Sequence, residues 1–196
     1  MSQLENTIRR AGAIRGLFLG VILLALSIIS YYVLIYNTQN AWLILISPVI
    51  FSVVIPIIIV LIFCFNLRKR IGGYWTFRQA VTGIFIMFAV NYVIQVAGKD
   101  VVFAKFIEPD MIPKTEAAMM KGTEVMLKKT GASQAAIAQK KAEIQKKLDE
   151  QKDITTRAII QGYVITLLLL FALALIFAAL LKRNRPEYQS YNDGAG

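Results

Sequence analysis

Four stretches of this chain contain no charged residue, and each is long enough to cross a lipid bilayer. They cover residues 16–36, 42–66, 79–98 and 158–181, with lengths of 21, 25, 20 and 24 residues. A helix needs about 20 mostly apolar residues to span the hydrocarbon core, because each residue advances it by about 1.5 Å. The sequence therefore predicts an all-α integral membrane protein with four transmembrane helices, and it excludes a soluble globular enzyme.

Net positive charge is concentrated in three of the segments that flank the predicted spans, and this pattern indicates the orientation of the chain. The long insert 99–157 has twelve basic and nine acidic residues, and its net charge of +3 does not change this prediction. The link 37–41 between spans one and two carries no charge. Lys and Arg favour the cytoplasmic side of a membrane, so both termini are predicted inside the cell and 37–41 outside. The basic residues on the predicted inner side are Arg9, Arg10, Arg15, Arg68, Lys69, Arg70, Arg78, Lys182, Arg183 and Arg185.

This orientation assigns a location to each part of the chain outside the spans. Residues 1–15 are predicted to form a cytoplasmic amphipathic N-terminus, and residues 182–196 a cytoplasmic tail. The insert 99–157 is predicted to lie outside the cytoplasm, between spans three and four. We expect the whole protein to be a multi-pass protein of the bacterial cytoplasmic (inner) membrane, with the lipid bilayer as its solvent.

Two helices are predicted within the insert, at about 112–129 and 134–152. Pro113 suits the first turn of a helix, and Gly131 suits the left-handed position that follows a helix end. Methionines give the first helix an apolar stripe, and the second has a thinner one. Two such helices can bury their stripes against each other, so a helical hairpin is expected.

Three glycines at a spacing of four residues lie near the start of the first span. Gly12, Gly16 and Gly20 fall on one helix face, where the absence of side chains lets another helix backbone approach closely. The partner can be another span of the same chain or a second copy of the protein. The sequence does not decide between helix packing within the chain and a homo-oligomer.

Three side-chain amides are predicted at membrane depth. Asn91 and Gln95 share a face of span three, and Gln161 lies in span four. Amides in lipid are unfavourable unless they form hydrogen bonds, so bonds to another helix are expected, including one to Gln161. The alternative is a polar path through the membrane beside span two, where Pro48 and Pro56 disfavour a straight helix.

The chain lacks the residue patterns of the common catalytic and binding centres. It contains no histidine, and none of its four spans contains a carboxylate, so no metal site is predicted. It has no glycine-rich phosphate loop, and its basic residues are dispersed rather than gathered on one nucleic-acid-binding face. The sequence therefore predicts no enzyme activity, no cofactor and no nucleic-acid partner.

A pattern at the start of span three resembles a known family. It comprises a turn, an interfacial aromatic residue and a helix cap, and Ile107-Glu108-Pro109 follows downstream. This resembles the bacterial domain of unknown function 4199, whose members are four-span inner-membrane proteins with an extracytoplasmic helical insert. Glu108 stands where that family more often has Asp. The resemblance implies a layout but no activity, and it rests on Gly73, Tyr74, Thr76, Phe77, Gln79, Ala80 and Gly83.

Two functional hypotheses follow from these features. The first is a non-enzymatic accessory or scaffold component of the cell envelope, which binds another envelope or membrane protein through the hairpin outside the cytoplasm. Methionine-rich surfaces adapt to varied partners, which favours this hypothesis. The second is a small transporter or channel subunit that uses Asn91, Gln95 and Gln161.

Overall fold

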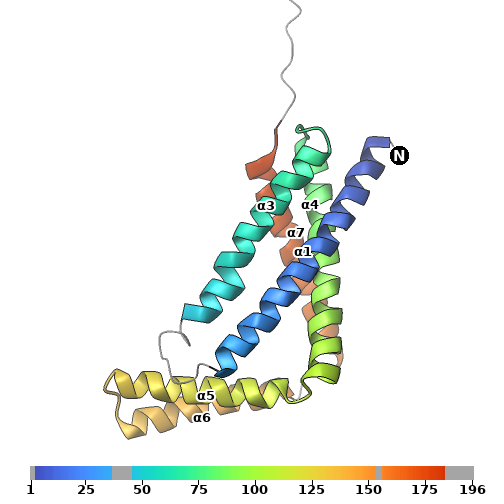
Figure 1. Cartoon of the computed structure of the whole chain (residues 1–196). Coiled ribbons are helices and arrows are strands. Elements are labelled where there is room, and N and C mark those ends of the chain that lie inside the picture. Colours follow the sequence, from blue (N-terminus) through green and yellow to red (C-terminus); the bar gives the residue numbers. More distant parts are fainter. Residues whose placement is uncertain (1–2, 37–45, 153–155, 184–196) are drawn as a thin grey trace, which may run out of the picture.

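The computed structural model describes residues 3–36, 46–152 and 156–183, which are predominantly helical (Figure 1). The predicted link 37–41, the residues just before the last helix and most of the tail 182–196 lie outside the described residues. A helical turn at 46–49 precedes η1. The elements in chain order are α1 (Gln3–Tyr36), η1 (Ile50–Val54), α3 (Ile55–Arg70), α4 (Phe77–Gln95), η2 (Val96–Ile107), α5 (Met111–Lys129), α6 (Gln134–Lys152) and α7 (Thr156–Leu181).

Four helices among the described residues are long and apolar enough to cross a membrane. They are Gln3–Tyr36, Ile46–Arg70, Phe77–Ile107 and Ile160–Leu181. The prediction of an all-helical chain with four spanning helices is therefore confirmed at the level of length and composition.

The helices extend beyond several of the predicted spans. Residues 3–15 are helical and continuous with the first predicted span, because α1 runs without a break through 34 residues. At about 1.5 Å per residue α1 is about 50 Å long, whereas the hydrocarbon core is about 30 Å thick. Similarly, the third helix continues past residue 98 as η2 and ends at Ile107, two residues before Pro109.

Two segments have the wider π-helical turn, which the sequence patterns did not predict. The first is η1, and it lies directly before Pro56, which occupies the first turn of α3. Proline lacks an N–H group, so it cannot donate to the preceding turn, and a local widening of the helix accommodates that loss. The second is η2, which likewise ends two residues before a proline, Pro109.

Helices α1 and α4 make the most extensive helix–helix contact in the structure, and glycines permit it. The two helices run in the same direction, since Gly12 faces Gly83, Gly16 faces Met87 and Gly20 faces Ile94. A Cβ atom on Gly12 would lie 2.7 Å from the Gly83 carbonyl oxygen. The glycine face therefore packs within the chain, and no second copy is needed to fill it.

Helix α7 completes the core on the other side of α4. Phe88 of α4 meets Phe177 of α7 edge to face, at 5.8 Å between ring centroids. Ala174 and Ala178 of α7 are fully buried in the same cluster. Small residues again allow one helix to lie close against another.

Helices α5 and α6 lie side by side across the end of the bundle opposite the N-terminus (Figure 1). Gly131 adopts the left-handed conformation in the turn between them, with φ +75°. Ala118 and Gly122 of α5 and Ile137 of α6 are buried. α5 also contacts α1, so this helix pair is attached to the spanning bundle.

Replacing Gly16 with Ala is expected to destabilise the protein by about 1–3 kcal/mol. The new Cβ would lie 2.6 Å from the backbone oxygen of Met87, so two helix backbones would have to move apart. The matched control is Gly162→Ala in α7, where a Cβ meets no atom within 4 Å. Thermal unfolding in detergent, followed by circular dichroism, compares the two variants. Equal melting temperatures would contradict the proposed role of Gly16.

Candidate functional site

The turn between α3 and α4 connects three helices at the end of the bundle that carries the N-terminus. Gly72 and Gly73 adopt positive φ angles of 100° and 81°, which side-chain-bearing residues rarely reach. They reverse the chain so that Trp75 points into the structure, where it is 2% exposed. Its indole Nε1 donates a hydrogen bond of 2.9 Å to the Leu181 carbonyl oxygen at the end of α7.

Backbone and side-chain contacts reinforce this attachment of α7. The Trp75 N–H donates to the Arg183 carbonyl at 3.0 Å, and the Arg183 N–H donates back at 3.3 Å. The Arg183 guanidinium lies over the Tyr74 ring, 5.3 Å from its centroid. The last carbonyls of a helix have no partner within that helix, so the turn supplies donors that α7 needs.

The beginning of α4 has the capping box that the sequence predicts. The Thr76 hydroxyl accepts from the Gln79 N–H, and the Gln79 side chain accepts from the Thr76 N–H. Ala80 is fully buried one turn later, and Gly83 faces Ile8 of α1. Phe77 is exposed. The residues of the turn motif thus fix the helices rather than line a common cavity.

A tryptophan at the end of a membrane span is expected at the lipid interface, but Trp75 is buried inside the protein. Its side chain is covered by α7 and by the helices of the core, so it is a docking residue and not a surface anchor. The partner carbonyl is 106 residues away in the chain. No local pattern reveals such a contact.

The three predicted intramembrane amides do not come together. Gln95 donates 3.1 Å to the Gly20 carbonyl oxygen of α1, not to Gln161. Gln161 is exposed on α7. The Asn91 Oδ1 atom is buried, and within the described part of the chain it has no hydrogen-bond partner. The expected bond from span three to another helix is therefore present, but it is made to α1.

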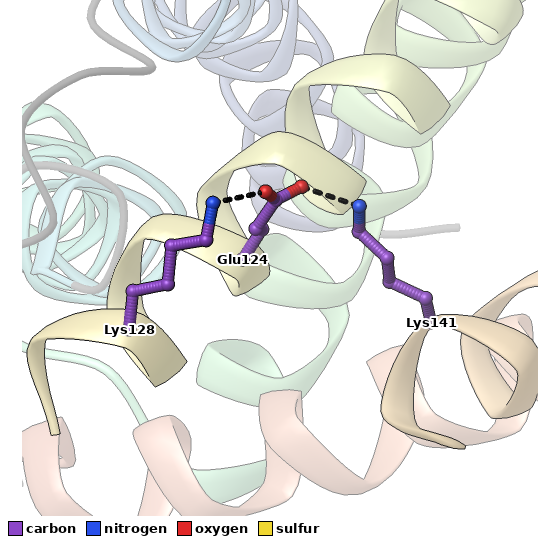
Figure 2. A network of polar contacts seen from close by, with 3 residues as sticks. All are labelled: Glu124, Lys128 and Lys141. Atoms are coloured by element: carbon purple, nitrogen blue, oxygen red, sulfur yellow. Dashed lines mark hydrogen bonds and ion pairs between the residues drawn. The ribbon is translucent and has the colours of Figure 1, made fainter. Parts of the chain in front are cut away.

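Ion pairs connect α5 and α6 at the opposite end of the bundle. The Glu124 carboxylate accepts from Lys128 on its own helix at 2.6 Å, and from Lys141 on α6 (Figure 2). Glu124 and Lys128 are four residues apart, a spacing that favours such a pair on a helix. These two ammonium groups lower the pKa of Glu124 from its usual 4.5 to about 2. Glu124 is therefore a carboxylate at neutral pH, and it bridges the two helices.

Four long apolar helices are typical of a multi-pass membrane protein. Small residues hold these helices together, and the turn between α3 and α4 caps one helix and holds the end of another. The family model described as "Protein of unknown function (DUF4199)" matches residues 15–183, so the chain belongs to this family. The resemblance inferred from the turn motif is therefore confirmed. No curated protein and no solved structure matches the chain.

Replacing Trp75 with Phe is expected to lower the free energy of unfolding by about 1 kcal/mol or more. The ring remains, but the buried Leu181 carbonyl loses its closest side-chain donor. Tyr74→Phe is the matched control, because it keeps the ring beneath Arg183 and removes only a hydroxyl. Thermal unfolding in detergent measures both. A stability change in Tyr74→Phe as large as that in Trp75→Phe would argue against the docking role.

The contact between α5 and α6 is expected to weaken in acid. A carboxyl whose pKa is lower in the folded state stabilises that state above its unfolded pKa, and this contribution is lost as the pH falls towards the folded pKa. For Glu124 the loss falls between about pH 4.5 and pH 2. Spin labels at Lys129 and Ala135, in a Cys64→Ala background, report the separation of the helices.

The Glu124→Gln variant should show a smaller pH-dependent change in separation over this range. Glu143→Gln is the control, because it removes a carboxylate that pairs with Lys140 on the same helix, α6. Raised salt should weaken the Glu124 bridge in the parent protein, because exposed ion pairs are screened. A Glu124→Gln profile identical to that of the parent would contradict the bridge.

Proposed function

We propose that this protein is a non-enzymatic accessory or scaffold component of the bacterial cytoplasmic membrane. In this proposal both termini lie in the cytoplasm, and α5 and α6 lie outside it. The exposed surface of α6 binds another envelope or membrane protein, while the four spanning helices anchor that surface to the bilayer.

The distribution of basic residues supports this orientation. Arg68, Lys69 and Arg70 occupy the last turn of α3, and Arg9 and Arg10 lie near the start of α1. Lys182 follows α7 directly. These positions are at the end of the bundle opposite α5 and α6 (Figure 1). An excess of Lys and Arg near the membrane favours the cytoplasmic side.

The observation that carries the proposal is the isolation of α6. Within the described residues its extensive contacts are with α5 alone. On α6, Ile137 is buried and Ile144 is half-buried, whereas Ala135, Ala138, Lys140 and Ala142 are exposed. A helix with little contact to the anchor contributes little to the bundle itself. Its outward face is therefore free to bind a partner.

The ion pairs made by several acidic side chains support a binding role over a catalytic one. Glu108 pairs with Lys114, Glu124 pairs with two lysines, and Glu143 pairs with Lys140. Acid–base catalysis by carboxyl groups needs environments that shift their pKa values towards the working pH. The pKa of Glu124 is shifted the other way. Such pairing is typical of a charge-balanced surface.

A small transporter or channel subunit remains the second candidate. The buried Asn91 Oδ1 favours it, since an unpaired polar atom at membrane depth is costly and is often functional. The amide of Gln95 weighs against it, because that group is engaged by the Gly20 carbonyl. The exposure of Gln161 on a different helix also weighs against a common path.

One crosslinking experiment tests both the orientation and the partner. In a Cys64→Ala background, Ala138→Cys places a thiol on the exposed face of α6, and Asn6→Cys places one near the start of α1. A membrane-impermeant maleimide crosslinker is added to intact cells. The Ala138→Cys variant is expected to form one discrete adduct with another protein. The Asn6→Cys variant should react only after the cells are opened.

Each part of the proposal has its own contradicting result. Reaction of Asn6→Cys in intact cells would overturn the orientation. Labelling of Ala138→Cys without any protein adduct would overturn the partner-binding role. An adduct of twice the mass of the chain would make a second copy the partner, and it would contradict the accessory role.

A further inference from the structure

A cavity of about 460 Å³ lies between the predicted spans, at the end of the bundle that α5 covers. One wall is the second half of α1, from Leu23 to Leu34, and another is the segment from Pro48 to Pro56. Gln95 and Lys99 line it from the third spanning helix, and α5 contributes Met111 and Thr115. Its volume falls within the range of about 300–1,000 Å³ that is typical of small-molecule sites.

The walls of this cavity are mainly apolar, with polar groups at a few positions. Leu23, Leu26, Leu34 and Phe51 supply hydrocarbon surface. A cavity of this kind in a membrane-spanning bundle accommodates an alkyl chain without exposing it to water. The polar groups then determine which head group can accompany that chain.

Lys99 provides a positive charge on the lining. It is half-buried, and among the side chains that the structure describes it has no ion-pair partner. None of the described lining residues is acidic. A cation near the hydrocarbon region is stabilised when an anion lies beside it, so the cavity favours a negatively charged ligand.

Tyr31 provides an unused hydrogen-bond donor on the same lining. Its side chain is 9% exposed, and its hydroxyl is buried without a hydrogen-bond partner among the described residues. The ring packs against Phe103 of η2, at 5.4 Å between centroids. The hydroxyl is not open to the cavity, so a ligand reaches it only after the side chain shifts. Because a buried hydroxyl without a partner is unfavourable, a hydrogen bond to a ligand compensates such a shift.

Two acids interact electrostatically with Tyr31, and one of them is paired. They are Glu108 and Asp110, and the Glu108 carboxylate accepts a hydrogen bond from Lys114. The same bond raises the pKa of Lys114, which therefore stays protonated at neutral pH. The charge of Glu108 is therefore balanced locally, and the positive charge of Lys99 lies on a lining whose described residues include no acid.

We propose that this cavity binds an anionic phospholipid of the surrounding bilayer. One acyl chain lies between α1 and the segment from Pro48 to Pro56. The phosphate lies beside Lys99 and accepts a hydrogen bond from the Tyr31 hydroxyl. This inference requires only that the helices span a bilayer, and it does not depend on the side on which α5 lies or on a protein partner for α6.

Native mass spectrometry of the full chain tests the site. The protein is released from nanodiscs that contain equal amounts of phosphatidylglycerol and phosphatidylcholine with identical acyl chains. The parent protein is expected to retain phosphatidylglycerol preferentially. Lys99→Gln should reduce that preference by about fivefold, the effect of about one basic group near a lipid phosphate. Tyr31→Phe, which keeps the ring beside Phe103, should also reduce it.

The matched control for charge is Lys105→Gln, since Lys105 lies on η2 but is exposed and does not line the cavity. An equal loss in Lys105→Gln, or no preference in the parent, would overturn the proposal. The chain-binding part is tested by Ser30→Trp, which fills the cavity and should prevent retention. Ile29→Trp, which points a ring away from it, is the control and should retain the lipid.

A competition experiment distinguishes binding of a phospholipid from binding of a free phosphate compound. Glycerol 3-phosphate has the phosphate group without acyl chains. At millimolar concentration it should not displace the retained phosphatidylglycerol. Displacement, or equal retention by Ser30→Trp and the parent, would mean that the acyl chain is not recognised and would overturn the assignment of a phospholipid.

Discussion

The close approach of α1 and α4 is the constraint on which the rest of this structure depends. Lipid tails are as apolar as leucine, so burial of apolar surface does not drive helices together in a bilayer. Tight packing and hydrogen bonds must do so instead. Gly12 and Gly16 bring backbone against backbone, and the same approach lets the Gln95 amide reach the Gly20 carbonyl. One amide that would be unfavourable in lipid thereby becomes a link between two spans.

The position of α7 depends on other contacts, made at both α4 and the turn before α4. Its contacts with α4 depend on the small residues Ala174 and Ala178 and on aromatic pairs. At the end near the N-terminus, Trp75 and the backbone around it satisfy the last carbonyls of α7. The turn between α3 and α4 therefore has a structural role: it caps α4 and holds the end of α7.

Contacts between residues close in the sequence could be predicted, whereas contacts between residues far apart in the sequence could not. The capping box at Thr76 and Gln79 and the pair Glu124–Lys128 involve residues three or four apart, so their spacing alone identifies them. The partner of Gln95 is 75 residues away, and the partner of Trp75 is 106 residues away. The cavity with Lys99 combines residues from four parts of the chain, and no single pattern contains them.

The sequence by itself determined that this chain has four helices suited to a bilayer, because the solvent preference of an uncharged run of about 20 residues is a local property. It also determined that Gly12, Gly16 and Gly20 form one face, since the helix period is local too. Only the tertiary structure decided that this face packs against α4, that α7 docks on Trp75, and that Tyr31 and Lys99 line one cavity. Those outcomes depend on how complete helices fit together, and shape complementarity between distant segments is not encoded in either segment alone.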